Sequence, residues 1–283
     1  MFYLIQKRSS NINATIQYFY SKIIVMKIIL LLGLFAALLT ACGSESPASA
    51  YPDISEFNTN RSDQFLVGMD DVADGQMHRG KNASAAHPGA HIHFQNNAGG
   101  SQWPNGTAAK DYPKIYAVAN GTISNVDTYY EVVNSQKTHY RYGIRLDFAS
   151  SDGQTISMSY SIEPMVDPGD EQFYLDFITV AKGDTVKKGD VIAYMYISPD
   201  ATIGTDHHIH FNLLKSQSGG GSIMQAPSIF STDIMTQFLA KLTGGNHNYD
   251  GGKNTGTFME DCMGYKIAAD EHPYENVASD CLK

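Results

Sequence analysis

Short alternating segments separated by glycine-containing turns fill the middle of this 283-residue chain, and they constrain its fold most strongly. Residues 142–148 alternate apolar and polar side chains, a Ser-Asp-Gly turn follows at 151–153, and residues 155–160 return as the partner strand. Residues 114–123 are β-branched and aromatic around an Asn-Gly turn, and residues 180–192 hold two Gly-Asp turns between short strands. This pattern predicts an all-β fold, a β-barrel or sandwich hybrid of short antiparallel strands.

One helix and an irregular tail are expected after the strands. The helix is predicted over residues 231–241, with Ser231 as its N-cap and the glycine pair at 244–245 ending it. Its apolar face has helical spacing, with Ile234, Phe238 and Leu242. The tail, residues 244–283, is rich in Gly, Asn and Asp, and a disulfide between its Cys262 and Cys281 is expected if the chain is exported.

The first 41 residues have the pattern of an export leader. Residues 27–38 are a lysine followed by an apolar run too short to span a bilayer comfortably, and a Leu-Thr-Ala triplet stands directly before Cys42. This order resembles a bacterial lipobox, which implies cleavage before Cys42 and acylation of its thiol. We therefore exclude residues 1–41, with Met26 as an alternative start, from the fold. Residues 42–52 are small and polar and are interpreted as a flexible tether.

In the remaining chain a β domain is expected over residues 53–243, with its core at 85–215. Its net charge limits the kinds of partner that it can bind. The whole chain has a net charge of −9, and without the four basic residues of 1–41 it has 16 basic and 29 acidic residues, a net charge of −13. Such a surface argues against nucleic acid and against an electrostatic grip on anionic lipid. Membrane attachment is therefore expected through a lipid anchor. By resemblance to Gram-negative lipoproteins, Gly43 and Ser44 favour the outer membrane of the cell envelope, facing the periplasm.

Histidines carry the strongest chemical signal. Six of the ten histidines fall in two compact clusters, at residues 87–93 and 207–210. Because side chains alternate along an extended strand, His208 and His210 point the same way, about 6 to 7 Å apart. A zinc site needs three or four ligands, which one strand cannot supply. The two remote clusters are therefore expected to meet around one bound cation.

Five segments in order resemble the lysostaphin-type zinc endopeptidases, which cut peptide cross-links in bacterial cell walls. The segments are residues 87–91 (HPGAH), 114–126 (KIYAVANGTISNV), 142–148 (YGIRLDF), 180–195 (VAKGDTVKKGDVIAYM) and 208–211 (HIHF). The resemblance lies in their order and spacing and covers about residues 85–215. It implies a zinc metalloendopeptidase that hydrolyses peptide bonds of peptidoglycan through a zinc-bound water.

The resemblance assigns site residues position by position. His87 fills the place of the first zinc ligand, and His210 fills that of the closing ligand. His208 takes the place of the histidine that faces the reacting water. Two positions depart from the family pattern, because His91 stands where the family has a ligating aspartate and Tyr160 where it has a catalytic histidine. The expectation is therefore Zn²⁺ held by His87, His91 and His210, with His208 and Tyr160 as catalytic groups.

Alternatives stay open at both departures. His93 shares a face with His91 in an extended segment and could be the ligand instead. His139 lies beside the 142–148 strand and could fold back to supply the missing histidine. The loss of a catalytic histidine also fits an inactive or weakened module that binds cell-wall peptide or regulates another cell-wall hydrolase. A third reading is a zinc-binding surface protein whose substrate is not the cell wall.

Overall fold

The computed structural model describes residues 51–76, 90–95, 102–133, 138–199, 207–225 and 227–244. All of them belong to one compact unit, Ser49–Lys283. The expected leader, most of the tether and all but the first residue of the tail lie outside the described residues, as do Cys42, His87, Cys262 and Cys281.

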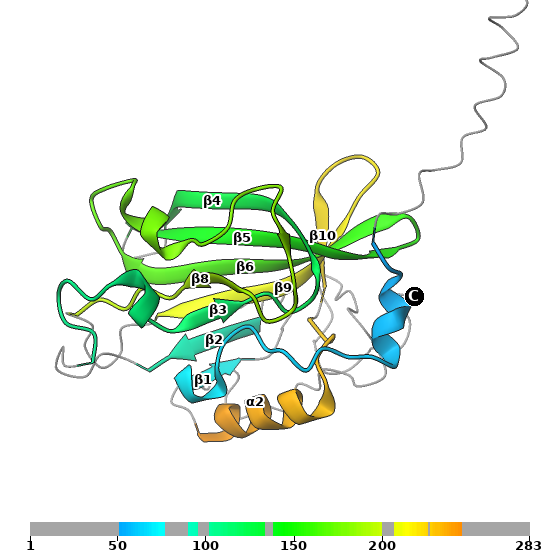
Figure 1. Cartoon of the computed structure of the whole chain (residues 1–283), viewed down its shortest axis with the longest axis horizontal. Helices are drawn as coiled ribbons and strands as arrows, with labels where there is room; N and C mark the ends of the chain where they lie inside the picture. Colours follow the sequence, from blue (N-terminus) through cyan, green and yellow to red (C-terminus); the bar gives the residue numbers. More distant parts are fainter. Residues whose placement is uncertain are drawn as a thin grey trace, which may run out of the picture. The chain divides into compact units, whose positions relative to one another are not determined.

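An eight-stranded antiparallel sheet forms the main layer (Figure 1), in the order β1-β2-β9-β6-β5-β4-β7 with β10 paired to β9. Its strands are β1 Val72–Gln76, β2 Ala90–Phe94, β4 Gly121–Val133, β5 Thr138–Ser151, β6 Gln154–Val166, β7 Thr185–Val186, β9 His208–Ser216 and β10 Ser222–Gln225. The all-β expectation is confirmed. The outer strands β1 and β7 do not pair with each other within the described ranges, so this sheet stays open where a barrel would close.

The two faces of the sheet differ because side chains alternate along each strand. On β6, Met158, Tyr160 and Ile162 point into the hydrophobic core. The intervening positions are polar, namely Ser157, Ser159, Ser161 and Glu163. The neighbouring strands β5 and β9 show the same alternation. One face of the sheet is therefore packed into the core, and the other carries hydroxyls, imidazoles and carboxylates.

A second, two-stranded sheet covers the core face. It consists of β3 Lys114–Tyr116 and β8 Val191–Tyr194. The hydroxyl of Tyr142 on β5 donates a hydrogen bond to the carbonyl of Tyr194, which ties the two sheets together. Short 3₁₀ turns at Ile54–Asn58, Met69–Asp71, Ala109–Asp111 and Phe173–Phe177 connect the layers.

The predicted helix is present as α2, Thr232–Gly244, and it packs along β1 (Figure 1). The Ser231 hydroxyl accepts a hydrogen bond from the amide of Ile234 at 3.4 Å, as expected of an N-cap. Phe238 enters the core, with its ring centroid 5.1 Å from that of Phe65. Among the described helices, none combines the length and apolar character needed to cross a bilayer.

The predicted turns are formed by the residues that favoured them. Asp152 and Gly153 have φ of 52° and 72° and join β5 to β6 as a two-residue hairpin turn. Gly183 and Gly189 have φ of 98° and 89°, a region that glycine enters without steric cost. The Asp152-Gly153 turn fixes the register of β5 against β6.

Candidate metal centre

The candidate site lies across the seam between β2 and β9. His91 pairs with His210, Ile92 with Ile209, and His93 with His208. Because opposite residues of an antiparallel pair share a face, the two isoleucines enter the core together. The same register brings four imidazoles together on the polar face.

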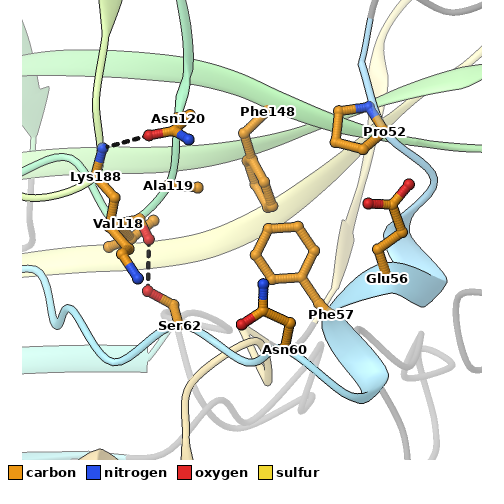
Figure 2. Close-up of a pocket in the computed structure, with 10 residues that line it drawn as sticks. All are labelled: Pro52, Glu56, Phe57, Asn60, Ser62, Val118, Ala119, Asn120, Phe148 and Lys188. Atoms are coloured by element: carbon orange, nitrogen blue, oxygen red, sulfur yellow. Dashed lines mark hydrogen bonds between the residues drawn. The ribbon is translucent and has the colours of Figure 1, made fainter.

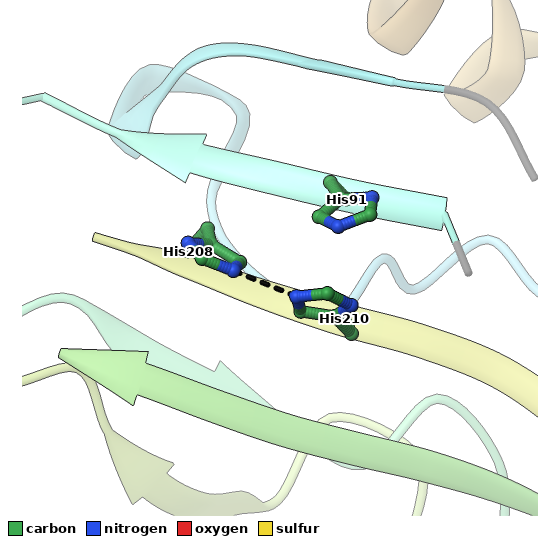
Figure 3. Close-up of side chains that lie close together, drawn as sticks. All are labelled: His91, His208 and His210. Carbon is green, nitrogen blue, oxygen red and sulfur yellow. Dashed lines mark hydrogen bonds between the residues drawn. The ribbon is translucent and has the colours of Figure 1, made fainter. Parts of the chain in front are cut away.

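Three of these imidazoles converge (Figure 3). One ring nitrogen from each of His91, His208 and His210 lies within 4.8 Å of the other two. The Nε2 atoms of His208 and His210 are 2.7 Å apart, and the ring centroids of His91 and His210 are 3.8 Å apart. His91 and His208 are buried, at 2% and 5% exposed, and the side chain of His210 is 12% exposed. The structure thus brings together three of the four histidines expected at the site.

The trio fits a zinc ion. Imidazole nitrogens are ordinary zinc ligands, and three of them are a known set for a catalytic zinc site. Two nitrogens on one tetrahedral zinc at 2.0–2.1 Å lie about 3.3 Å apart. The 2.7 Å between the His208 and His210 nitrogens is a hydrogen-bond distance, so binding requires these two rings to separate by roughly half an ångström. A small rotation of either side chain provides that movement.

His93 lies beside the trio. Its Nδ1 is 2.5 Å from Oδ1 of Asp74, its partner on β1, and both side chains are buried. Its ring centroid is 5.6 Å from that of His208. His93 is bound by a carboxylate at Nδ1 and is not one of the three converging histidines, so the alternative that made it the ligand in place of His91 is not favoured.

Glu163 on β6 faces the trio from the other side, in register with His208. Its Oε2 lies 3.4 Å from Nε2 of His208 and its Oε1 lies 3.5 Å from Nε2 of His210. The guanidinium of Arg141 donates to Oε1 at 2.5 Å. Burial opposes ionisation of this carboxyl, but the neighbouring imidazoles of His139, His208 and His210 outweigh it and hold the pKa of Glu163 well below its ordinary value.

His139 reaches the site indirectly. It lies at the start of β5, is 1% exposed, and places its Nε2 3.6 Å from Oε2 of Glu163. His139 therefore lies near the site, as the alternative expected. Its contact is with Glu163, and it is outside the converging trio.

The structure places Tyr160 elsewhere than the sequence predicted. Its hydroxyl donates to the carbonyl of Tyr116 and accepts from the amide of Val118, both at 3.1 Å, on the core side of β6. Burial raises the pKa of this phenol, outweighing the hydrogen bond from Val118. Because Ser161 is the β6 residue opposite His210 and adjacent residues face opposite ways, Tyr160 points away from the histidines. The structure thus places Tyr160 on the core side of the sheet and not among the histidines, where it was expected.

A separate cavity of about 220 Å³ lies elsewhere in the fold (Figure 2). The rings of Phe57 and Phe148 meet edge to face in it, and the Ser62 hydroxyl donates to the carbonyl of Val118 at 2.6 Å. None of the site histidines lines it. This cavity is therefore separate from the β2–β9 seam.

Comparison with known proteins adds little to this geometry. No protein-family model matches the chain, and no curated protein matches it. Among solved structures it is similar to the NMR solution structure of lysostaphin, with 15% sequence identity and a TM-score of 0.32 over 58% of this chain. The chain spans about half the length of that structure, 51%. A likeness this distant carries no functional argument.

Proposed function

We propose that this chain is a zinc-dependent peptidase that hydrolyses peptide bonds of peptidoglycan. The observation that carries the proposal is the convergence of His91, His208 and His210 from two strands that are remote in sequence. The order of the five segments within residues 85–215 supports cell-wall peptide as the substrate class.

We assign a different role to each residue of the site. A bound zinc ion would supply a Lewis acid for the scissile carbonyl. His91, which is buried, and His210, whose side chain is 12% exposed, would hold the ion. His208, at hydrogen-bond distance from His210, is either the third ligand or a proton carrier at its Nε2. His87 stays a predicted ligand.

The zinc content of purified variants distinguishes a metal ligand from a proton carrier. Loss of zinc in His208→Ala assigns that residue as a ligand, whereas full zinc content with lost hydrolysis assigns it to proton transfer. Loss of zinc in His87→Ala adds that residue to the ligand set. His207→Asn is the matched control, because it changes a buried imidazole one residue from the trio and is expected to leave zinc content unchanged.

The activity itself is tested with purified peptidoglycan, with and without a chelator. Release of new amino groups that stops on chelation and returns with added zinc is the expected result. Zinc binding without cleavage would instead indicate the non-catalytic module that binds cell-wall peptide. That outcome has some support in the structure, because Tyr160 does not reach the site.

We also propose that the protein is anchored by lipid at Cys42 in the outer membrane, facing the periplasm. The support is the apolar run at 27–38 and the small residues around Cys42. Labelled fatty acid should enter the wild-type protein and not Cys42→Ser. A soluble periplasmic wild-type protein would contradict the anchor and leave the peptidase proposal standing.

A further inference from the structure

We propose that Glu163 is the positioning residue of this metal centre, a fixed carboxylate that aims the rings of His208 and His210 at His91. This inference rests on the proposed zinc site and adds a residue that belongs to no recognised motif. It starts from the arrangement of side chains along one row of the sheet.

A continuous polar row crosses four strands at the same level. Asp74 on β1 pairs with His93 on β2, His93 pairs with His208 on β9, and His208 pairs with Glu163 on β6. Two imidazoles are thus flanked by two carboxylates. Asp74 contacts His93, and Glu163 contacts His208 and His210 of the trio.

The two oxygens of Glu163 reach different histidines. Oε2 approaches Nε2 of His208 and Oε1 approaches Nε2 of His210, at 3.4 and 3.5 Å. One carboxylate therefore sets the orientation of both rings. These are the same nitrogens that face each other across 2.7 Å, so in the metal-free protein the carboxylate holds both rings with their Nε2 atoms turned inward. Loss of a group that orients metal-binding histidines typically weakens metal affinity 10- to 100-fold.

Glu163 is itself held in place. The Arg141 guanidinium bonds to Oε1 and also lies over the ring of Tyr130, 4.3 Å from its centroid. The hydroxyl of Ser161 donates to Oε1 at 3.2 Å. With the glutamate 2% exposed and bonded from two sides, its carboxylate has little freedom to turn away. An all-imidazole zinc site carries two uncompensated positive charges, and Glu163 supplies a nearby negative one.

The test compares Glu163→Gln and Glu163→Asp with Asp147→Asn. Asp147 is a carboxylate on the same face of β5, bound by Ser124 and Ser157 away from the trio, so Asp147→Asn is the matched control. Zinc affinity is measured by titration on the folded proteins, and imidazole ¹⁵N resonances are recorded on the metal-free proteins. We expect Glu163→Gln to bind zinc about 10- to 100-fold more weakly. We also expect it to shift the ¹⁵N resonances of both His208 and His210, with partial recovery in Glu163→Asp and no change in Asp147→Asn.

Three outcomes decide the matter. Zinc affinity of Glu163→Gln within threefold of wild type, or unshifted imidazole resonances, overturns the positioning role and leaves the zinc site intact. A wild-type protein that binds no zinc overturns the proposed function as well. If Glu163→Gln fails to fold, Glu163→Asp decides on the same two measurements, because it keeps the charge and moves the oxygens away from both rings.

Discussion

The two faces of strands β2, β9 and β6 are built from neighbouring residues and do opposite work. On one face Ile92, Ile209 and Ile162 pack into the core with no exposed area. On the other face, one residue along each strand, lie the imidazoles and Glu163, also enclosed. The difference is that the apolar face needs only volume, whereas every buried polar group on the other face needs a partner.

This contrast makes the polar face sensitive to single atoms. His93, His208 and His210 each have a neighbour within hydrogen-bond or ion-pair distance, and one carboxylate contacts two of them. The core face tolerates changes of similar volume at modest cost. Substitutions on the two faces should therefore separate metal binding from stability.

The largest effect is expected from His210→Ala, which removes the histidine common to the closest contacts of the trio. Zinc affinity should fall by at least about a thousandfold, beyond the loss typical of an outer partner. Isothermal titration calorimetry with zinc measures this. The fold should persist by circular dichroism, and an unchanged affinity would contradict the site.

On the core face, Ile162→Ala should cost about 2 to 5 kcal/mol of unfolding free energy, because it empties volume at a fully buried position. Urea unfolding of the metal-free protein measures the loss. Zinc affinity of the folded fraction should stay within a few-fold of wild type. A large loss of affinity would show that the faces are not independent.

Tyr160→Phe should cost about 1 to 3 kcal/mol, since it leaves the buried amide of Val118 without its acceptor. Hydrolysis and zinc affinity should be unchanged, because the hydroxyl lies on the core side. A catalytic Tyr160 would instead lower the rate by roughly two orders of magnitude at unchanged stability. The two measurements together decide on which face this side chain acts.

The smallest effect is expected at Asp71, a half-buried acid whose pKa is raised by burial and by neighbouring Asp70. A raised folded-state pKa means that the ionised form costs stability above that pKa, and that the cost disappears as the pH falls through it. Asp71→Asn should therefore stabilise the protein at pH 7 by less than about 1 kcal/mol. The gain should narrow in acid, as measured by thermal unfolding at pH 7 and pH 3.

Much of the fold followed from the sequence because its signals are local. The Asp152-Gly153 turn, the two Gly-Asp turns and the capped helix each depend on residues within a few positions. The meeting of His91 with His208 and His210 was anticipated from ligand chemistry, and the trio confirms that two clusters converge. The openness of the sheet was not predictable, because it depends on which edge strands find partners.

At the site, one residue was predicted on the wrong face of its strand, and another was missed because it belongs to no motif. Tyr160 was placed by counting along a family pattern, although the alternation from Ser157 to Glu163 already assigns it to the apolar side. The same alternation puts Glu163 on the polar face. It was missed because a single glutamate has no motif, and its importance comes from register with His208, a contact between distant strands.

The seam between β2 and β9 joins segments that are far apart along the chain. A cation held there would act as a cross-link closing a long loop, and its binding energy would add to folding energy, because the unfolded chain does not present the site. Metal binding would then require the pairing of these two strands, a late and non-local step of folding. Chelation would separate the molecule first where β2 and β9 meet.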